Sequence, residues 1–266
     1  MHRKIRPPAV AGLFYPGDAG ELARTVRVLL DAVIPPAGPR AAGAWHALIV
    51  PHAGYPYSGP VAASAYRMLA GRGGEIRRVV LLGPAHRVYL QGVALPSVDA
   101  FVTPLGEIPL DRESLDVLAR VPGVAVSDTA HAMEHSLEVQ LPFLQSVLDD
   151  FTLVPLVVGD CPADLVAGLL ARFADDPHTL IVVSSDLSHF LDYEAACATD
   201  QATSQAIVAR TGNLGPEQAC GARAVNGLLL LARQRGWQVT ELDLRNSGDT
   251  AGGRAEVVGY GAYAVT

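Results

Sequence analysis

Leu180-Ile-Val-Val-Ser-Ser-Asp186-Leu-Ser-His189 is a run of branched apolar residues that ends in hydroxyl groups, an acid and an imidazole. Three further segments have the same form, and they span residues 46–52, 79–86 and 242–249. Short apolar runs that Pro, Gly or Ser interrupts are typical of the buried strands of an α/β sheet. Ligands and reacting groups gather beyond the carboxyl ends of such strands. If these strands are neighbours that point the same way, we expect their terminal side chains to meet in one cleft.

The rest of the apolar pattern predicts that helices alternate with strands. Helices are expected near residues 21–32, 60–70, 111–120, 134–148, 162–173, 193–210 and 216–235. Further strands are expected at residues 152–158, 238–244 and 256–265, and a short one near 92–95. This alternation predicts a three-layer α/β/α sandwich around a mixed, mostly parallel sheet. The last two strands have no helix between them, so we expect them to pair antiparallel.

The composition predicts one domain that spans residues 1–266. The chain has 266 residues, of which 50% are hydrophobic and 18% are charged, so it can bury a large core. No composition break or repeat divides it. The nearest feature to a linker, at residues 34–43, is interpreted as a surface loop.

Charge and cysteine content exclude several classes of protein. The net charge is −7 and the basic residues are scattered, so we expect neither nucleic-acid binding nor a polybasic membrane patch. The basic start of the chain runs into Pro7-Pro8 where a signal peptide needs an apolar stretch, and the cytoplasm is the expected location. The three cysteines are widely spaced, which predicts neither a disulfide framework nor a zinc knuckle.

His52 and His86 are the strongest candidates for metal ligands. Each follows a proline-containing bend after an apolar run, which places the imidazole at the end of a strand. Neutral imidazole is a common ligand for iron, copper and zinc. Asp249 follows the strand at Leu242 and is the expected third ligand, because two histidines and one carboxylate form a non-haem iron(II) site. The alternative is that both histidines are unrelated loop residues that bond to the backbone.

Asp186 and His189 form a second candidate group, for acid–base catalysis. Hydroxyl, carboxyl and imidazole groups are costly to bury on a core strand unless they are satisfied. His189 is interpreted as a general base or a further ligand, and Asp186 as a group that orients an imidazole. The alternative for Asp186 is that it caps a helix, and the sequence favours neither interpretation.

Two other segments carry candidate residues. In Glu134-His-Ser-Leu-Glu138, one histidine lies between two acids, so the order does not fit the metalloprotease motif H-E-x-x-H. His135 is expected to reach the cleft as a catalytic residue, while the two acids fit a helix-stabilising first turn. Beside His52, the side chains of Tyr55, Tyr57 and Ser58 are candidates to bind a planar substrate, with packing inside the domain as the alternative.

Taken together, seven blocks of sequence resemble the Memo family, in its prokaryotic branch called AmmeMemoRadiSam system protein B. These blocks occur in order along nearly the whole chain, so the resemblance is specific. They read Pro8-Ala-Val-Ala-Gly-Leu-Phe-Tyr-Pro16, Pro51-His-Ala-Gly-Tyr55 with Tyr57-Ser-Gly59, Gly83-Pro-Ala-His86, Thr103-Pro-Leu-Gly106, Glu134-His-Ser-Leu-Glu138, Ser184-Ser-Asp186 and Val257-Val-Gly-Tyr260.

The resemblance implies a fold shared with class III extradiol dioxygenases, which are non-haem iron enzymes. It implies that His52 and His86 bind metal and that His189 matches the catalytic base of those dioxygenases. The animal member is a metal-binding redox protein linked to cell motility, and its third metal position is a cysteine near the C-terminus. This chain has no cysteine after Cys220, and Thr250, beside Asp249, stands at or near that position. The branch name implies a radical-SAM partner protein, whose CxxxCxxC motif this chain lacks.

Three hypotheses about function follow. The first is an iron(II)-dependent oxidoreductase or dioxygenase-like enzyme, with copper or zinc as the alternative metal and an unidentified small-molecule substrate. The second is a binding module that kept the cleft of an enzyme and recognises a peptide or a system partner. The third is a metal hydrolase in which Asp186, His189 and His135 hold a second ion. The fold alone does not choose among them.

Overall fold

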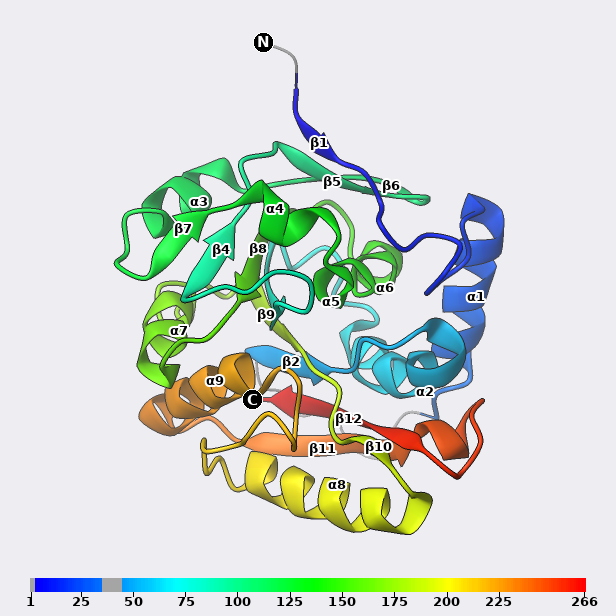
Figure 1. Ribbon diagram of the computed structural model, residues 1–266. Coiled ribbons are helices and arrows are strands. Elements are labelled where there is room, and N and C mark those ends of the chain that lie inside the picture. Colours follow the sequence, from blue (N-terminus) through cyan, green and yellow to red (C-terminus); the bar gives the residue numbers. More distant parts are fainter. Residues whose placement is uncertain (1–2, 35–44) are drawn as a thin grey trace.

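Four parallel strands form the centre of a large sheet in the computed structural model of the chain (Figure 1), which describes residues 3–34 and 45–266. In spatial order these strands are β2 (Ala47–Val50), β9 (Thr179–Ser184), β3 (Arg78–Pro84) and β8 (Thr152–Val158). Nearly all of their side chains are buried, as expected of strands that helices cover on both faces. The predicted surface loop at 34–43 lies, apart from Ile34, outside the described residues.

Antiparallel strands extend this core on both sides and make the sheet mixed. On one side β12 (Val257–Val265) pairs with β2, and both β11 (Val239–Asn246) and β10 (His189–Leu191) pair with β12. On the other side β4 (Val93–Leu95) runs antiparallel to β8, and β7 (Val124–Val126) runs parallel to β4. The expected antiparallel pairing of the last two long strands is confirmed, because β11 and β12 are aligned from Val239 to Asn246.

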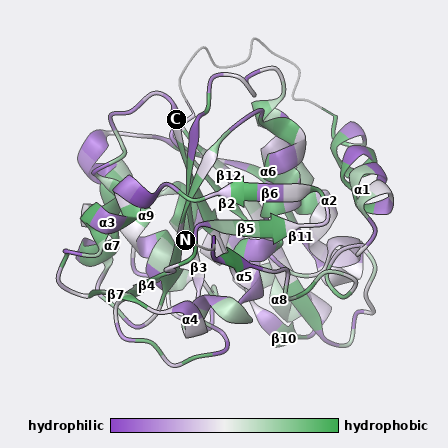
Figure 2. Cartoon of the chain, turned by 90° about the horizontal axis from the view of Figure 1, so that it is seen from above, coloured by the Kyte–Doolittle hydropathy of each residue, from purple (hydrophilic) through white to green (hydrophobic). Residues whose placement is uncertain are grey.

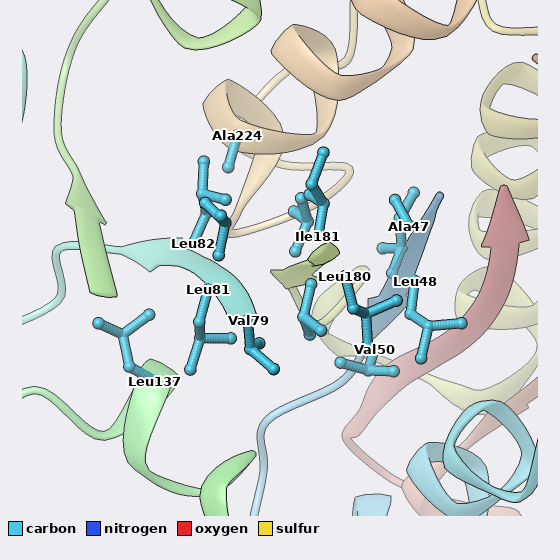
Figure 3. Packing of buried hydrophobic residues seen from close by; sticks show 14 of the residues in the cluster. Ala47, Leu48, Val50, Val79, Leu81, Leu82, Leu137, Leu180, Ile181 and Ala224 are labelled. Atoms are coloured by element: carbon cyan, nitrogen blue, oxygen red, sulfur yellow. The ribbon is translucent and has the colours of Figure 1, made fainter. Parts of the chain in front are cut away.

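Helices cover both faces of the sheet, so the predicted α/β sandwich is confirmed. In the described residues the helices are α1 (Ala19–Asp31), α2 (Tyr55–Tyr66), η1 (Arg67–Leu69), α3 (Arg112–Leu118), α4 (Asp128–Ala132), α5 (His135–Glu138), α6 (Leu141–Val147), α7 (Ala163–Leu170), α8 (Tyr193–Val208), α9 (Ala222–Arg235) and η2 (Ser247–Asp249). Successive side chains of β3 point to opposite faces. Figure 3 shows Leu82 directed toward Ala224 of α9 and Leu81 toward Leu137 of α5.

Prolines account for two differences between the predicted and observed helices. Helix α2 begins at Tyr55, before the expected start at residue 60, because Gly54 occupies the N-cap and Pro56 fits the first turn. The single helix expected over residues 134–148 is split into α5 and α6. Pro142 has no N–H to donate to the carbonyl of Glu138, so a continuous helix would lose a hydrogen bond there.

A small second sheet, which the sequence did not indicate, holds the N-terminal segment. Strand β1 (Ile5–Arg6) pairs parallel with β5 (Ala100–Thr103), which pairs antiparallel with β6 (Gly106–Pro109). Beyond β1 the buried carboxylate of Glu138 accepts hydrogen bonds from the backbone N–H groups of Ala9 and Val10. The start of the chain is therefore fixed to α5, which also carries a residue of the candidate site.

Apolar residues concentrate on the central strands, and polar residues lie on the outer helices and loops (Figure 2). Helix α1 illustrates the pattern, because Leu22, Val26 and Leu30 are buried at helical spacing while Arg24 and Arg27 between them are exposed. Among the helices that the structure describes, none combines the length and the hydropathy needed to span a bilayer.

Candidate metal centre

Three histidines from separate parts of the chain meet at the carboxyl edge of the central strands. His52 follows β2, His86 follows β3, and His135 is the first residue of α5. One ligand nitrogen from each ring lies within 4.8 Å of the other two. The ring centroids of His52 and His86 are 5.2 Å apart, and both strands run parallel to β9, so the two histidines reach the same edge of the sheet. Imidazoles in this arrangement can bind one ion together.

His135 joins the pair because α5 packs unusually close to β3. The ring centroids of His135 and His86 are 4.8 Å apart and the rings are stacked. A side chain at Gly83 would place its Cβ 2.6 Å from the hydroxyl oxygen of Ser136, the residue after His135. That hydroxyl donates a hydrogen bond to the carbonyl of Pro84 at 3.0 Å. The absence of a side chain at Gly83 therefore allows the close contact that brings His135 to the site.

Glu134 orients His86. Its Oε1 is 2.9 Å from His86 Nδ1, and its Oε2 accepts the backbone N–H of His86 at 2.6 Å. Burial alone would raise the pKa of Glu134, but hydrogen bonds from His86 and Ser136 outweigh burial and lower the pKa to about 2. An ionised carboxylate on Nδ1 leaves Nε2 of His86 free to bind a metal. The sequence explained Glu134 only as part of an acidic first turn, and it is in fact the N-cap of α5 as well.

Burial keeps the other two imidazoles neutral. The pKa of His52 is lowered well below its usual value, mainly by burial and then by the neighbouring histidines. The pKa of His135 is lowered to about 4, again mainly by burial. The Nδ1 of His135 is buried without a hydrogen-bond partner, and Glu134 Oε1 is 3.5 Å from it. A buried nitrogen without a partner costs stability unless something binds it, which fits a metal ligand.

Cys220 and Asp186 lie beside His52. The Sγ of Cys220 is 3.2 Å from His52 Nε2, and one oxygen of Asp186 accepts the backbone N–H of His52 at 2.7 Å. Burial raises the pKa of the Cys220 thiol to about 12 and that of Asp186 to about 7, so the thiol is protonated at neutral pH. A Cβ at Gly221 would lie 2.7 Å from the Cβ of Ser185, so this glycine allows Cys220 to approach the site.

Asp249, the expected third ligand, is not in the group of ligand atoms that the three histidines form. One of its oxygens accepts the hydroxyl of Tyr193 at 2.6 Å, and the other accepts the backbone N–H of Asn246 at 3.1 Å. Both contacts stabilise the short helix η2, where Asp249 completes a capping box. Thr250 follows it at the end of the same turn. Neither Asp249 nor Thr250 belongs to the histidine cluster, and the cysteine that lies beside His52 is Cys220.

The candidate substrate-binding residues separate into two groups. Tyr55 is buried and its hydroxyl donates to the carbonyl of Val139, and Ser58 is buried and donates to the carbonyl of Ala53. Both side chains thus have structural partners. Tyr57 is 43% exposed and remains available to a ligand. A residue that the sequence did not single out, Phe14, lies against His135 with the ring centroids 4.7 Å apart.

His189 lies on a distorted edge strand. Burial lowers the pKa of His189 first of all, a hydrogen bond with the backbone of Leu187 opposes this, and positive charge on His86 lowers the pKa further. The register between β10 and β12 shifts between His189 and Leu191, which makes Phe190 the extra residue of a β-bulge. Phe190 has a φ of 60° and is 72% exposed. A bulge beside a functional site commonly directs a side chain, and here the neighbour of Phe190 is the candidate base.

Replacing Phe190 by glycine is expected to give a more stable protein than replacing it by alanine, by about 1 kcal/mol, because glycine adopts a positive φ without strain. At the exposed position Val28 inside α1, the opposite order is expected, since glycine in a helix interior costs about 1 kcal/mol relative to alanine. Chemical denaturation of the four variants measures both differences. If alanine is the more stable residue at position 190 as well, the backbone at Phe190 is not strained.

The chain matches the family described as Memo-like protein over residues 6–264. A MEMO1 family protein of Ignicoccus hospitalis is 36% identical to it over 97% of both chains. A MEMO1 family protein of Thermotoga neapolitana is 37% identical over 96% of this chain and 98% of its own length. An uncharacterized Escherichia coli K12 protein of known crystal structure is similar with a TM-score of 0.49 and 15% identity, and covers 81% of this chain and 99% of its own. The chain belongs to the Memo family.

Proposed function

We propose that this protein binds one non-haem metal ion, iron(II), through His52, His86 and His135, and uses it as an oxidoreductase on a hydroxylated small molecule. The observation that carries the proposal is the cluster of three ligand nitrogens within 4.8 Å of one another. Three imidazoles leave coordination positions open for substrate, unlike the four protein ligands of a closed structural site. When bound, the metal would supply Lewis acidity and one-electron chemistry toward a substrate hydroxyl and dioxygen.

Side chains beside the three histidines could act in acid–base catalysis. Asp186 is almost fully buried, and its second oxygen is 4.0 Å from His52 Nε2. His189 lies on β10, and positive charge on His86 contributes to lowering its pKa. We expect one of these two groups to take the proton that a substrate hydroxyl loses, and the thiol of Cys220 adds a further polar atom next to His52. The resemblance to extradiol dioxygenases makes iron(II) the first choice over copper and zinc.

The other two hypotheses make different demands on these residues. A hydrolase with two ions would use His135 for the second ion, but His135 lies in the same cluster as His52 and His86, which favours a single ion. A module that only recognises a peptide or partner protein needs the cleft and no turnover. The aromatic side chains of Phe14, Tyr57 and Phe190 could contact a peptide as well as a small-molecule substrate. They therefore do not distinguish a binding module from an enzyme, and a measurement of activity does.

Anaerobic reconstitution with iron(II) tests the proposal. About one iron per chain is expected by metal analysis, with dioxygen consumption when a catechol or another dihydroxy compound is supplied. His52→Ala should abolish both, while His178→Ala should not, because His178 bonds to the carbonyl of Glu75 outside the cluster. Iron bound without oxygen consumption for any compound would contradict the enzyme and favour the binding module. Equal iron content in the His52 variant would contradict the metal centre itself.

A further inference from the structure

Ser184 lies beneath His52 at the end of β9. It is fully buried, and it is aligned with Val50 of β2, two residues before His52. Its hydroxyl oxygen is 2.6 Å from the carbonyl of Ser136, 2.8 Å from Nε2 of Gln140 and 2.9 Å from Nδ1 of His52. Three polar groups therefore converge on one hydroxyl.

The hydroxyl of Ser184 can donate its proton to only one of these three groups with all three hydrogen bonds kept. A serine hydroxyl carries one proton and two lone pairs, and a carbonyl oxygen can only accept a hydrogen bond. Ser184 must therefore donate its proton to the carbonyl of Ser136. Both lone pairs remain, so the hydroxyl accepts hydrogen bonds from Gln140 and from His52. For His52 this requires a proton on Nδ1.

Contacts on both sides of the Gln140 amide fix its orientation. Its Nε2 also donates to the carbonyl of Pro51 at 2.9 Å, and its Oε1 is 2.9 Å from the hydroxyl of Tyr66. If the amide were turned over, its oxygen would face the carbonyl of Pro51, with no proton between the two acceptors. Gln140 thus presents a donor to Ser184, and the chain of hydrogen bonds from Tyr66 to His52 has one consistent direction.

We propose that Ser184 is a positioning residue that holds His52 in the tautomer with a proton on Nδ1 and a free lone pair on Nε2. The Nε2 atom, on the other side of the ring from Ser184, lies 3.2 Å from the Sγ of Cys220. The hydroxyl thus acts through His52, and it is held in turn by Gln140, the N-cap of α6, and through Gln140 by Tyr66 of α2. The consequence for metal affinity rests on the proposed function, whereas the tautomer itself does not.

The tautomer can be measured without any metal. Long-range ¹H–¹⁵N spectra of the metal-free protein, labelled with ¹⁵N-histidine, distinguish a protonated ring nitrogen from a bare one, and His52→Gln assigns the signals. We expect a proton on Nδ1 of His52 in the wild-type protein. A proton on Nε2 would overturn the proposal, and this result does not depend on the folding of any Ser184 variant.

Variants then test the role of the hydroxyl. In Ser184→Ala, His52 is expected to lose its single tautomer, and the zinc affinity, measured by chelator competition, is expected to fall about tenfold to hundredfold. Ser184→Thr keeps the hydroxyl and should retain both. Ser146→Ala is the matched control, because Ser146 donates to the carbonyl of Pro142 within its own helix. An unchanged tautomer and affinity in Ser184→Ala would overturn the proposal, whereas zinc binding that survives His52→Ala would contradict only the proposed function.

Discussion

Glu138→Ala is expected to lower the free energy of unfolding by about 3–5 kcal/mol. The Glu138 side chain is 0% exposed and that of its partner Arg6 is 4% exposed, with Nη1 and Oε2 2.7 Å apart. Removing the carboxylate leaves a buried guanidinium without its counter-charge, which is the costly way to break a buried ion pair. Denaturation by guanidinium chloride, followed by circular dichroism, measures the change.

The loss would extend beyond the ion pair, because Glu138 accepts four hydrogen bonds. Besides Arg6, the hydroxyl of Tyr15 donates to it at 2.6 Å, and the backbone N–H groups of Ala9 and Val10 donate at 2.8 and 2.9 Å. Glu138→Gln keeps the size of the side chain and part of its acceptor capacity, so an intermediate loss is expected. The difference between the two variants separates the effect of charge from that of the lost hydrogen bonds.

The surface ion pair between Arg3 and Glu107 is the control for this experiment. Their side chains are 54% and 33% exposed, so Glu107→Ala is expected to cost less than about 1 kcal/mol. If Glu138→Ala cost no more than Glu107→Ala, Glu138 would not anchor the N-terminal segment. The anchor matters for the site because the same segment carries Phe14, whose ring lies against His135 and whose carbonyl accepts the N–H of Tyr55 at 2.8 Å.

The sequence indicated the positions of His52 and His86 because each depends on local features. An apolar run, a bend with proline and a polar residue place a side chain at the end of a strand, and parallel neighbours bring those ends to one edge. The two strands are both neighbours of β9, so the local rule was sufficient. The same local features also indicated the position of Asp186. This residue follows the end of β9, and its carboxylate accepts the backbone N–H of His52.

For Asp249 the local rule was not sufficient, because the rule predicts the direction of a strand but not its place in the sheet. Strand β11 runs antiparallel to β12, which runs antiparallel to β2, so β11 and β2 point the same way, as the hypothesis required. However, β12 lies between them, and the carboxyl end of β11 is displaced from the histidines. The order of strands in a sheet depends on packing over the whole chain, which a single sequence pattern does not specify.

The sequence predicted His135 as a catalytic residue of the cleft, but it could not assign this residue to the histidine cluster or give Cys220 and Ser184 their places beside His52, for a related reason. His135 reaches the site through the contact of α5 with Gly83, and Cys220 through the contact of Gly221 with Ser185. Both are close approaches between segments far apart in the sequence. The sequence signal for these contacts was a glycine near each reactive side chain, Gly83 near His86 and Gly221 beside Cys220. A glycine indicates that another segment packs closely against the backbone, but it does not identify that segment.

If the proposed metal centre is right, His135→Ala is expected to weaken zinc or iron(II) binding by roughly a hundredfold or more, because it removes one of the three imidazoles of the cluster and leaves two to hold the ion. Asp249→Ala is expected to leave the affinity unchanged, since Asp249 bonds to Tyr193 and Asn246 instead. Chelator competition measures both variants, and circular dichroism checks that they fold.

Cys220→Ser decides between the two candidates for the third ligand. The Sγ of Cys220 contacts Nε2 of His52, but Cys220 does not belong to the group of ligand atoms that lie within 4.8 Å of one another. Metal binding would also require the buried thiol, with its raised pKa of about 12, to lose its proton. We therefore expect Cys220→Ser to reduce the affinity less than His135→Ala. The reverse order would place the thiol, and not the third imidazole, on the metal, and would move His135 into the role of a group that supports substrate.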